Sequence, residues 1–250
     1  MSNDVVEQIT IVTGGSRGIG AATARLCGAA GHAVCVVYRD QVKKADAVVA
    51  EIEAAGGKAI AVQADTAEEG DVERLFKEVD TRLGRVTGLV NNAGIHGPRL
   101  RVDELEAEAV HRVLAVNVAA LFQCSREAVR RMSTRYGGNG GAIVNISSGS
   151  ARLGSPGAGV LYAASKGAVN SLTVGLSQEV AGEGIRVNAV APGLTETDMP
   201  PPERLRNDGA AIPMGRVAQP EEVAEAILWL LSEKASYVAG ANLRVGGGRL

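Results

Sequence analysis

The feature of this sequence that most limits its fold is a regular alternation of short, continuously apolar runs with longer amphipathic stretches. Runs of strand length cover residues 9–13, 33–38, 58–63, 88–91, 142–146, 185–190 and 242–245. Helical patterns cover residues 18–30, 42–55, 71–83, 104–132, 160–181 and 221–231. A strand that is apolar at every position is usually covered on both faces, as in a parallel sheet between helices. The alternation therefore predicts an α/β fold, a doubly wound parallel sheet of about seven strands with helices on both faces.

The length and composition fit one globular unit. The chain has 250 residues, of which 46% are hydrophobic and 22% charged, and α/β folds of this size are often single domains. A formal net charge of −2 provides no basic face, which argues against nucleic acid as a partner. No apolar run reaches the length of a membrane span, and the acidic start lacks the pattern of a secretory signal. We expect one catalytic domain over residues 1–250, without membrane association.

The cysteines indicate the redox environment of the protein rather than a metal site. Cys27, Cys35 and Cys124 are odd in number, scattered, and without the spacing of metal ligands. We expect three buried, reduced thiols and no metal site. This pattern is typical of a protein in the reducing cytoplasm.

A glycine-rich segment, residues 13–20, joins the first predicted strand to the first predicted helix and reads T-G-G-S-R-G-I-G. Gly14 permits a tight turn, Gly18 lets the backbone approach a pyrophosphate, and Gly20 lets helix and strand pack closely. The helix start adds free N–H groups and a positive dipole that favour an anion. The segment predicts a Rossmann-type dinucleotide site, and its G-x-x-x-G-x-G spacing resembles the first motif of the short-chain dehydrogenase/reductase family.

The residues after the second strand favour NADP(H) over NAD(H). An acidic residue at that position would bind the ribose 2′-hydroxyl of NAD, and this chain has Tyr38 there. Arg39 follows, and Arg17 lies within the glycine loop, so two guanidinium groups could bind a 2′-phosphate. In the family that the chain resembles, basic residues at these positions accompany a preference for NADP. Asp40 leaves NAD open, because it lies one step beyond the usual acidic position.

Tyr162 and Lys166 form the predicted chemical core. They stand four positions apart at the start of a predicted helix, so they share one helical face. Carbonyl reduction needs a group that donates a proton as hydride arrives and accepts it in the reverse reaction. A phenol with a pKa of about 10 is poorly matched to neutral pH, and a nearby ammonium group would lower that pKa. Because such a pair is common by chance, its interpretation depends on further motifs.

Further motifs of the same family follow in order along the chain. Residues 91–94 read N-N-A-G, residues 145–148 read N-I-S-S, and residues 192–197 fit P-G-x-x-x-T. The resemblance extends from about residue 9 to residue 247. It implies strand order 3-2-1-4-5-6-7 and an enzyme that acts on CH–OH groups with NAD(P), usually as a homotetramer and sometimes as a homodimer.

The resemblance also implies a role for each site residue. Tyr162 is the general acid/base, Lys166 holds the nicotinamide ribose and tunes Tyr162, and Ser148 binds the substrate oxygen. Asn117 helps to position a water through which protons leave. The implied cofactor-binding residues are Gly14, Ser16, Arg17, Gly18, Ile19, Gly20, Tyr38, Arg39, Asp65, Asn91, Ala93, Gly94, Tyr162, Lys166, Pro192, Gly193, Thr195 and Thr197.

The serine assignment departs from the usual spacing of the family, which places its serine thirteen positions before the tyrosine. That position is Gly149 here, whereas Ser148 closes the N-I-S-S motif. A one-residue insertion between residues 149 and 159 would explain the shift. Ser147 is the alternative, and it would point to the opposite side if the strand continues.

The substrate is the least determined part of the prediction. Residues 193–216 contain several prolines and follow the sixth strand, so we expect them to form a substrate lid at the carboxyl edge of the sheet. A 3-oxoacyl thioester, a sugar and a small or hydrophobic ketone all stay open, since the chain resembles both 3-oxoacyl-[acyl-carrier-protein] reductase-like and glucose-dehydrogenase-like members. His96 could line the pocket mouth or be a plain loop residue. Trp229 lies in a very apolar predicted helix and fits either the core or a subunit interface.

A second class of function is a redox-inactive protein that binds NADP(H) as a sensor or partner-binding module. Such proteins usually lose the tyrosine, the lysine or the serine of the site. All three are present here, so the sequence favours the enzyme.

Overall fold

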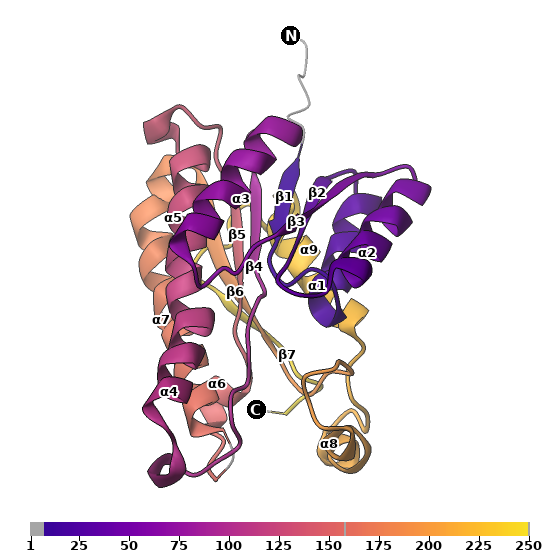
Figure 1. Ribbon diagram of the computed structural model, residues 1–250, viewed down its shortest axis with the longest axis vertical. Coiled ribbons are helices and arrows are strands. Elements are labelled where there is room, and N and C mark those ends of the chain that lie inside the picture. Colours follow the sequence, from indigo (N-terminus) through magenta and orange to yellow (C-terminus); the bar gives the residue numbers. More distant parts are fainter. Residues whose placement is uncertain (1–7, 158, 250) are drawn as a thin grey trace.

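The apolar runs pair side by side into one parallel sheet (Figure 1). The structure is a computed structural model that describes residues 8–157 and 159–249. Its strands are β1 (Ile9–Val12), β2 (Ala33–Tyr38), β3 (Lys58–Gln63), β4 (Gly88–Asn91), β5 (Gly141–Ile146), β6 (Ile185–Pro192) and β7 (Asn242–Val245). Their order is β3-β2-β1-β4-β5-β6-β7, and every pair is parallel. The predicted fold class and strand order are confirmed.

Helices cover both faces of the sheet, as Figure 1 shows. One layer contains α1 (Gly18–Ala29), α2 (Val42–Ala54) and α9 (Pro220–Leu231); the other contains α3 (Glu69–Arg82), α5 (Ala120–Met132) and α7 (Val160–Val180). Successive strand side chains point to opposite faces, so Ile11 packs under α3 and Val12 packs under α1. Two buried apolar cores result, and they hold the strands rigidly at both faces.

The helical region predicted for residues 104–132 is divided in the structure. A 3₁₀ turn (η1, Val102–Glu104) precedes α4 (Ala107–Leu114), and a π-helical segment (η2, Ala115–Ala119) separates α4 from α5. A π segment widens the turn and often occurs at functional sites. Asn117 lies at the centre of η2, so the division falls on one of the predicted catalytic residues.

The predicted lid leaves the carboxyl edge of the sheet after β6 and contains α8 (Pro202–Asn207) and η5 (Gly209–Ala211). We call residues 193–216 the lid segment. On the other side of the same edge, α6 (Ser150–Leu153) follows β5, and neither short helix was predicted. The remaining short turns are η3 (Thr134–Tyr136), η4 (Ala181–Glu183) and η6 (Glu233–Ala235).

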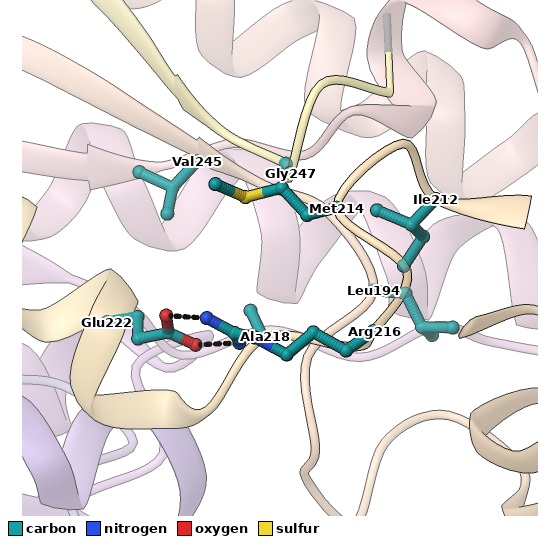
Figure 2. A pocket seen from close by; sticks show the side chains of 9 residues that line it. Leu194, Ile212, Met214, Arg216, Ala218, Glu222, Val245 and Gly247 are labelled. Atoms are coloured by element: carbon teal, nitrogen blue, oxygen red, sulfur yellow. Dashed lines mark hydrogen bonds and ion pairs between the residues drawn. The ribbon is translucent and has the colours of Figure 1, made fainter. Parts of the chain in front are cut away.

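The base of the lid segment is attached to β7 and α9. The Gly193 amide donates to the Val245 carbonyl at 2.8 Å, and the Met214 amide donates to the Gly247 carbonyl at 3.1 Å. A small cavity of about 70 Å³ lies at this base, and Figure 2 shows Met214 beside Val245 on one of its walls. Arg216 closes another wall through a bidentate ion pair with Glu222, at 2.7 and 2.6 Å. These bonds attach both ends of the lid segment to the rest of the fold.

The cysteines lie in the interior. Cys27, Cys35 and Cys124 are buried free thiols, as predicted. Burial raises the pKa of Cys27 and of Cys124 to about 12, which makes both thiols poor nucleophiles.

Candidate active site

The loop between β1 and α1 has the shape that a dinucleotide pyrophosphate requires. Gly14 and Gly18 adopt φ angles of +62° and +53°, which disfavour residues with a Cβ. A Cβ on Gly20 would lie 2.3 Å from the Gly14 carbonyl oxygen, so glycine is required there for packing. Neither a capping side chain nor an acidic residue occupies the first turn of α1 in the described structure. The N–H groups of this helix start are therefore free to bind an anion, and the site fits the predicted cofactor.

Asn92, which the sequence analysis did not single out, locks this loop to the end of β4. Its side-chain amide donates to the carbonyls of Thr13 and Gly14 at 2.8 and 3.1 Å. The Thr13 hydroxyl in turn accepts from the backbone amides of Asn92 and Ala93, both at 3.0 Å. These bonds fix the two loops relative to each other before any ligand binds.

The side chain of Asn91, a predicted cofactor-binding residue, lies in the interior of the protein. It is buried, and its amide donates to Asn145 at 2.9 Å and to Ser125 at 3.3 Å. Asn145 continues this network to Thr173 at 3.0 Å. The Asn91 side chain thus ties β4 to β5 and α5, because a buried amide must find partners within the protein.

The residues predicted for the adenosine end lie together at the ends of β1, β2 and β3. Tyr38 ends β2, and the exposed Arg39 after it pairs with Asp40 at 2.6 Å. Arg17 contacts Asp198 of the lid segment at 3.4 Å. Lys44 of α2, which the sequence analysis missed, contacts the same Asp198 oxygen at 3.3 Å. Its position in the first turn after β2 was the only signal for it.

Asp65 lies after β3 and faces two hydrogen-bond donors. It accepts from the Ala67 amide at 3.0 Å and from Arg112 of α4 at 2.9 Å. Burial alone would raise the pKa of Asp65, but the bonds from Arg112 and Ala67 outweigh it and lower the pKa. Asp65 is therefore a fixed carboxylate, and Arg112 already uses one of its oxygens.

Tyr162, Lys166 and Ser148 converge at the carboxyl edge of the sheet. Tyr162 and Lys166 lie in the first two turns of α7, and the Lys166 nitrogen is 5.8 Å from the centre of the Tyr162 ring. Ser148 follows β5 and hydrogen-bonds to Tyr162. The Lys166 ammonium donates to the Ile146 carbonyl at 2.7 Å. The structure thus brings together three predicted groups from two elements.

The pKa values of this pair differ from the expectation that Lys166 lowers the pKa of Tyr162. Burial raises the pKa of Tyr162, and the bond from Ser148 and the charge of Arg99 only partly oppose it. Burial also lowers the pKa of Lys166 from 10.5 to about 8. Both shifts have one cause, because a buried site disfavours the charged form of each group.

The two candidate serines point in different directions. The Ser147 hydroxyl is buried and contacts Asn170 of α7 at 2.5 Å and the Lys166 carbonyl at 3.3 Å. The half-buried Ser148 accepts from the Ser150 amide at 3.1 Å, where α6 begins, and reaches Tyr162. The geometry therefore favours Ser148 as the group beside Tyr162.

Asn117 is held between the loop after β4 and α7. Its amide oxygen accepts from the Ile95 amide at 2.9 Å, and its nitrogen donates to the Ile95 carbonyl at 2.8 Å and to Ser165 at 3.0 Å. A Cβ on Gly94 would lie 3.3 Å from the Asn117 oxygen and 3.4 Å from the Lys166 nitrogen. Gly94 thus leaves room for both groups to approach the backbone.

The start of the lid segment covers the glycine loop. Pro192 ends β6, and its carbonyl accepts from the Gly149 amide at 3.0 Å. Thr195 is buried and donates to the Gly193 carbonyl at 3.2 Å. The methyl group of Thr197 lies 3.1 Å from where a Gly18 Cβ would be, so Thr197 lies over the loop.

Two basic residues of the loop after β4 belong to the site. The sequence analysis left the role of His96 open and did not single out Arg99. The His96 ring stacks on Tyr162 with a centroid distance of 4.8 Å, so His96 lines the site and is more than a plain loop residue. Arg99 contributes a positive charge that acts on Tyr162. The signal in the sequence was their position directly after N-N-A-G, at the carboxyl end of β4.

The sequence matches known proteins along nearly its whole length. A family model described as enoyl-(acyl carrier protein) reductase matches residues 14–249. The chain belongs to the short-chain dehydrogenase/reductase family. As a member, it is an oxidoreductase that acts on CH–OH groups and binds a nicotinamide cofactor.

Relatives within the short-chain dehydrogenases/reductases share both sequence and fold. The uncharacterised oxidoreductase YgfF of Escherichia coli K12 is 51% identical over 96% of this chain and 99% of its own. The cis-4-hydroxycyclohexanecarboxylate dehydrogenase of Sinomonas cyclohexanicum is 39% identical over 99% of this chain and 98% of its own. A short-chain dehydrogenase from Burkholderia cenocepacia, solved in complex with NADP, is 37% identical with a TM-score of 0.88 and covers 96% of this chain and 97% of its own.

A helix that crosses a membrane must be both long and apolar. In the described part of this family member, none of the helices is long and apolar enough to cross a bilayer.

Proposed function

We propose that this protein is an NADP(H)-dependent oxidoreductase that interconverts a carbonyl and an alcohol, with Tyr162 as the general acid/base. One observation carries the proposal: Tyr162 lies beside Ser148 and Lys166 at the same sheet edge as an open glycine loop. When bound, the nicotinamide supplies or accepts the hydride. The protein then has to hold the substrate oxygen and move one proton.

The chain's own groups divide this work. Tyr162 donates a proton to the carbonyl oxygen, and in the reverse direction it removes the alcohol proton. Ser148, which already bonds to Tyr162, donates a second hydrogen bond and stabilises the charge that develops on that oxygen. The raised pKa of Tyr162 keeps its proton in place until the substrate arrives.

Lys166 and Asn117 connect Tyr162 to the proton supply. A pKa of about 8 lets Lys166 gain and lose a proton near neutral pH, which suits a relay. Its nitrogen and the Asn117 oxygen both lie within 3.4 Å of the space above Gly94. In the proposed reaction Lys166 holds the nicotinamide ribose, and Asn117 positions the backbone of Ile95 and a water molecule.

Preference for NADP(H) rests on the charges around the adenosine end. Arg39 directly follows the half-buried Tyr38, where an NAD-specific site would have a carboxylate. Arg17 and Lys44 add two further cations, which meet at Asp198. Guanidinium groups suit a 2′-phosphate because they can bind it in a bidentate manner. The solved Burkholderia cenocepacia relative, which binds NADP, supports this choice.

The test is a spectrophotometric screen at about 340 nm, where reduced nicotinamides absorb. It uses NADPH and NADH in turn against 3-oxoacyl thioesters, aldoses, diketones, cyclic ketones and keto acids, including 4-oxocyclohexanecarboxylate after the Sinomonas relative. We expect turnover with NADPH that is lost in Tyr162→Phe and kept in the exposed control Tyr136→Phe. Turnover that survives Tyr162→Phe would disprove the catalytic assignment. Tight NADPH binding without turnover of any class would favour the redox-inactive sensor.

We also propose a cytoplasmic homotetramer. Phe122 on α5 and Val174 on α7 are 59% and 46% exposed, and Trp229 on α9 is 40% exposed on the opposite layer. Two separate apolar surfaces suit the two kinds of interface in a symmetric tetramer, whereas one would suffice for a homodimer. Light scattering on the purified protein, with Phe122→Glu and Trp229→Glu as separate variants, tests this. Each variant should stop assembly at a dimer.

A further inference from the structure

The loop after β4 carries a cation that has no partner in the described structure. Residues 92–99 are half-buried and irregular, and Arg99 lies at their end. Within residues 8–157 and 159–249, Arg99 makes neither a hydrogen bond nor an ion pair, and desolvation by burial lowers its pKa. A partly desolvated charge without a partner costs free energy, and an anion bound beside it would offset that cost.

The nearest acidic side chains along the chain are already engaged elsewhere. Asp103 pairs with the Arg101 guanidinium at 3.0 Å, and Glu104 accepts from the Arg101 amide at 3.1 Å. Arg101 is thus neutralised by its neighbours, whereas Arg99 is not. The two arginines stand two positions apart and form a natural pair for comparison.

Arg99 lies in the same loop as His96, three positions further along the chain. Its charge acts on Tyr162 and on His96, and His96 stacks directly on the Tyr162 ring. Arg204 of α8 adds a second charge that acts on both His96 and Arg99 from the lid segment, although Arg204 is itself paired with Asp208 at 2.9 Å.

We propose that Arg99 binds an oxyanion carried by the substrate, a carboxylate or a phosphate, beside the carbonyl that Tyr162 protonates. This inference rests on the proposed function and narrows it to anionic substrates. A guanidinium group binds either oxyanion through two parallel hydrogen bonds, which also fixes the orientation of the carbonyl.

The kinetic test compares charged substrates with uncharged analogues of nearly equal size. Levulinate is measured against methyl levulinate, and dihydroxyacetone phosphate against dihydroxyacetone, so that the two arms separate carboxylate from phosphate. In the wild-type protein kcat/KM should be at least about tenfold higher for one charged member than for its analogue. Arg99→Gln should remove this preference, so that kcat/KM for the charged member falls to that of its uncharged analogue, and it should leave the Kd for NADPH unchanged. Arg101→Gln should behave as the wild type.

A binding test can decide the proposal even if the protein turns over none of these substrates. The melting temperature is measured with NADPH present while phosphate or levulinate is added, for wild type, Arg99→Gln and Arg101→Gln. Stabilisation that is present in the wild type and in Arg101→Gln, but absent in Arg99→Gln, supports the anion site. Equal kcat/KM for charged and uncharged members, or equal stabilisation of all three proteins, overturns it. Tyr162-dependent turnover of uncharged carbonyls without any charge preference would leave the proposed function intact and reject only the anion site.

Discussion

The imidazole of His96 lies flat against the phenol ring of Tyr162, with centroids 4.8 Å apart and planes inclined by 14°. The contact joins the loop after β4 to the first turn of α7, so it holds Tyr162 between two elements. Burial, followed by the charge of Arg99, lowers the pKa of His96. His96 is therefore neutral at pH 7, and it positions the tyrosine by stacking rather than by charge.

Replacing His96 with alanine should lower kcat without affecting cofactor binding. An aromatic pair contributes about 0.5–1.5 kcal/mol beyond its buried area, so its loss corresponds to a decrease of roughly two- to tenfold. The exposed His111 on α4 provides the control, His111→Ala. Steady-state kinetics and an NADPH titration check the outcome. A His96→Ala protein with normal kcat would show that stacking has no positioning role.

Asp198 should weaken NADPH binding, because its carboxylate forms ion pairs with Arg17 and Lys44 at 3.4 and 3.3 Å. The bonds and charges of these cations lower the pKa of Asp198, so it is ionised at neutral pH. We expect Asp198→Asn to bind NADPH about two- to fivefold more tightly at low salt, since exposed ion pairs are worth at most about 1 kcal/mol. NADH affinity should not change.

The dependence of NADPH affinity on salt concentration is a further test of this prediction. The gain in NADPH affinity should shrink as the ionic strength rises, because exposed charges are screened. Asp208→Asn removes another carboxylate from the lid segment, one that pairs with Arg204, and it should leave NADPH affinity unaltered. An equal gain for NADH and NADPH would mean that Asp198 acts on the whole cofactor and not on the 2′-phosphate.

We expect the buried Lys166 side chain to lower the free energy of unfolding at neutral pH. Burial lowers its pKa from 10.5 to about 8, so between these values the unfolded chain binds more protons than the native protein. Stability linked to Lys166 therefore rises with pH across this window and is at its lowest below pH 8. We expect Lys166→Met to be inactive and yet more stable than the wild type at pH 7, by up to about 3 kcal/mol.

Urea unfolding at several pH values between 7 and 9.5 measures this effect. Tyr162 makes the opposite contribution above about pH 10, because its raised pKa means that the native state keeps its proton longer, so the range stops below that point. The difference between wild type and Lys166→Met should narrow as the pH rises. A difference that stays constant with pH would assign it to packing instead.

Gly94 should be required for rate more than for folding. A methyl group there would crowd the Asn117 oxygen at 3.3 Å and the Lys166 nitrogen at 3.4 Å, and both contacts are tight. We expect Gly94→Ala to lower kcat about tenfold or more, as small displacements of catalytic groups do, with a small change in melting temperature. Gly175→Ala on α7, where a Cβ meets open space, is the matched control. Normal kcat in Gly94→Ala would mean that the two groups can shift freely.

The sequence by itself determined the sheet, the glycine loop and the pairing of Tyr162 with Lys166. Each depends on local information: continuous apolar runs specify buried parallel strands, and a spacing of four specifies one helical face. Strand order followed because the motifs that the chain shares with its family occur in the same sequence order. The predicted boundaries of α1, α2 and α9 lie within a residue or two of the observed ones, because helical periodicity is also local information.

Only the tertiary structure decided how these local parts meet. The π segment at Asn117, the stacking of His96 on Tyr162 and the contact of Asp198 with Arg17 join residues far apart in the chain. The raised pKa of Tyr162 likewise comes from burial, which depends on every element packed around it. No periodicity records such contacts, because they arise when separate loops are brought to one edge of the sheet.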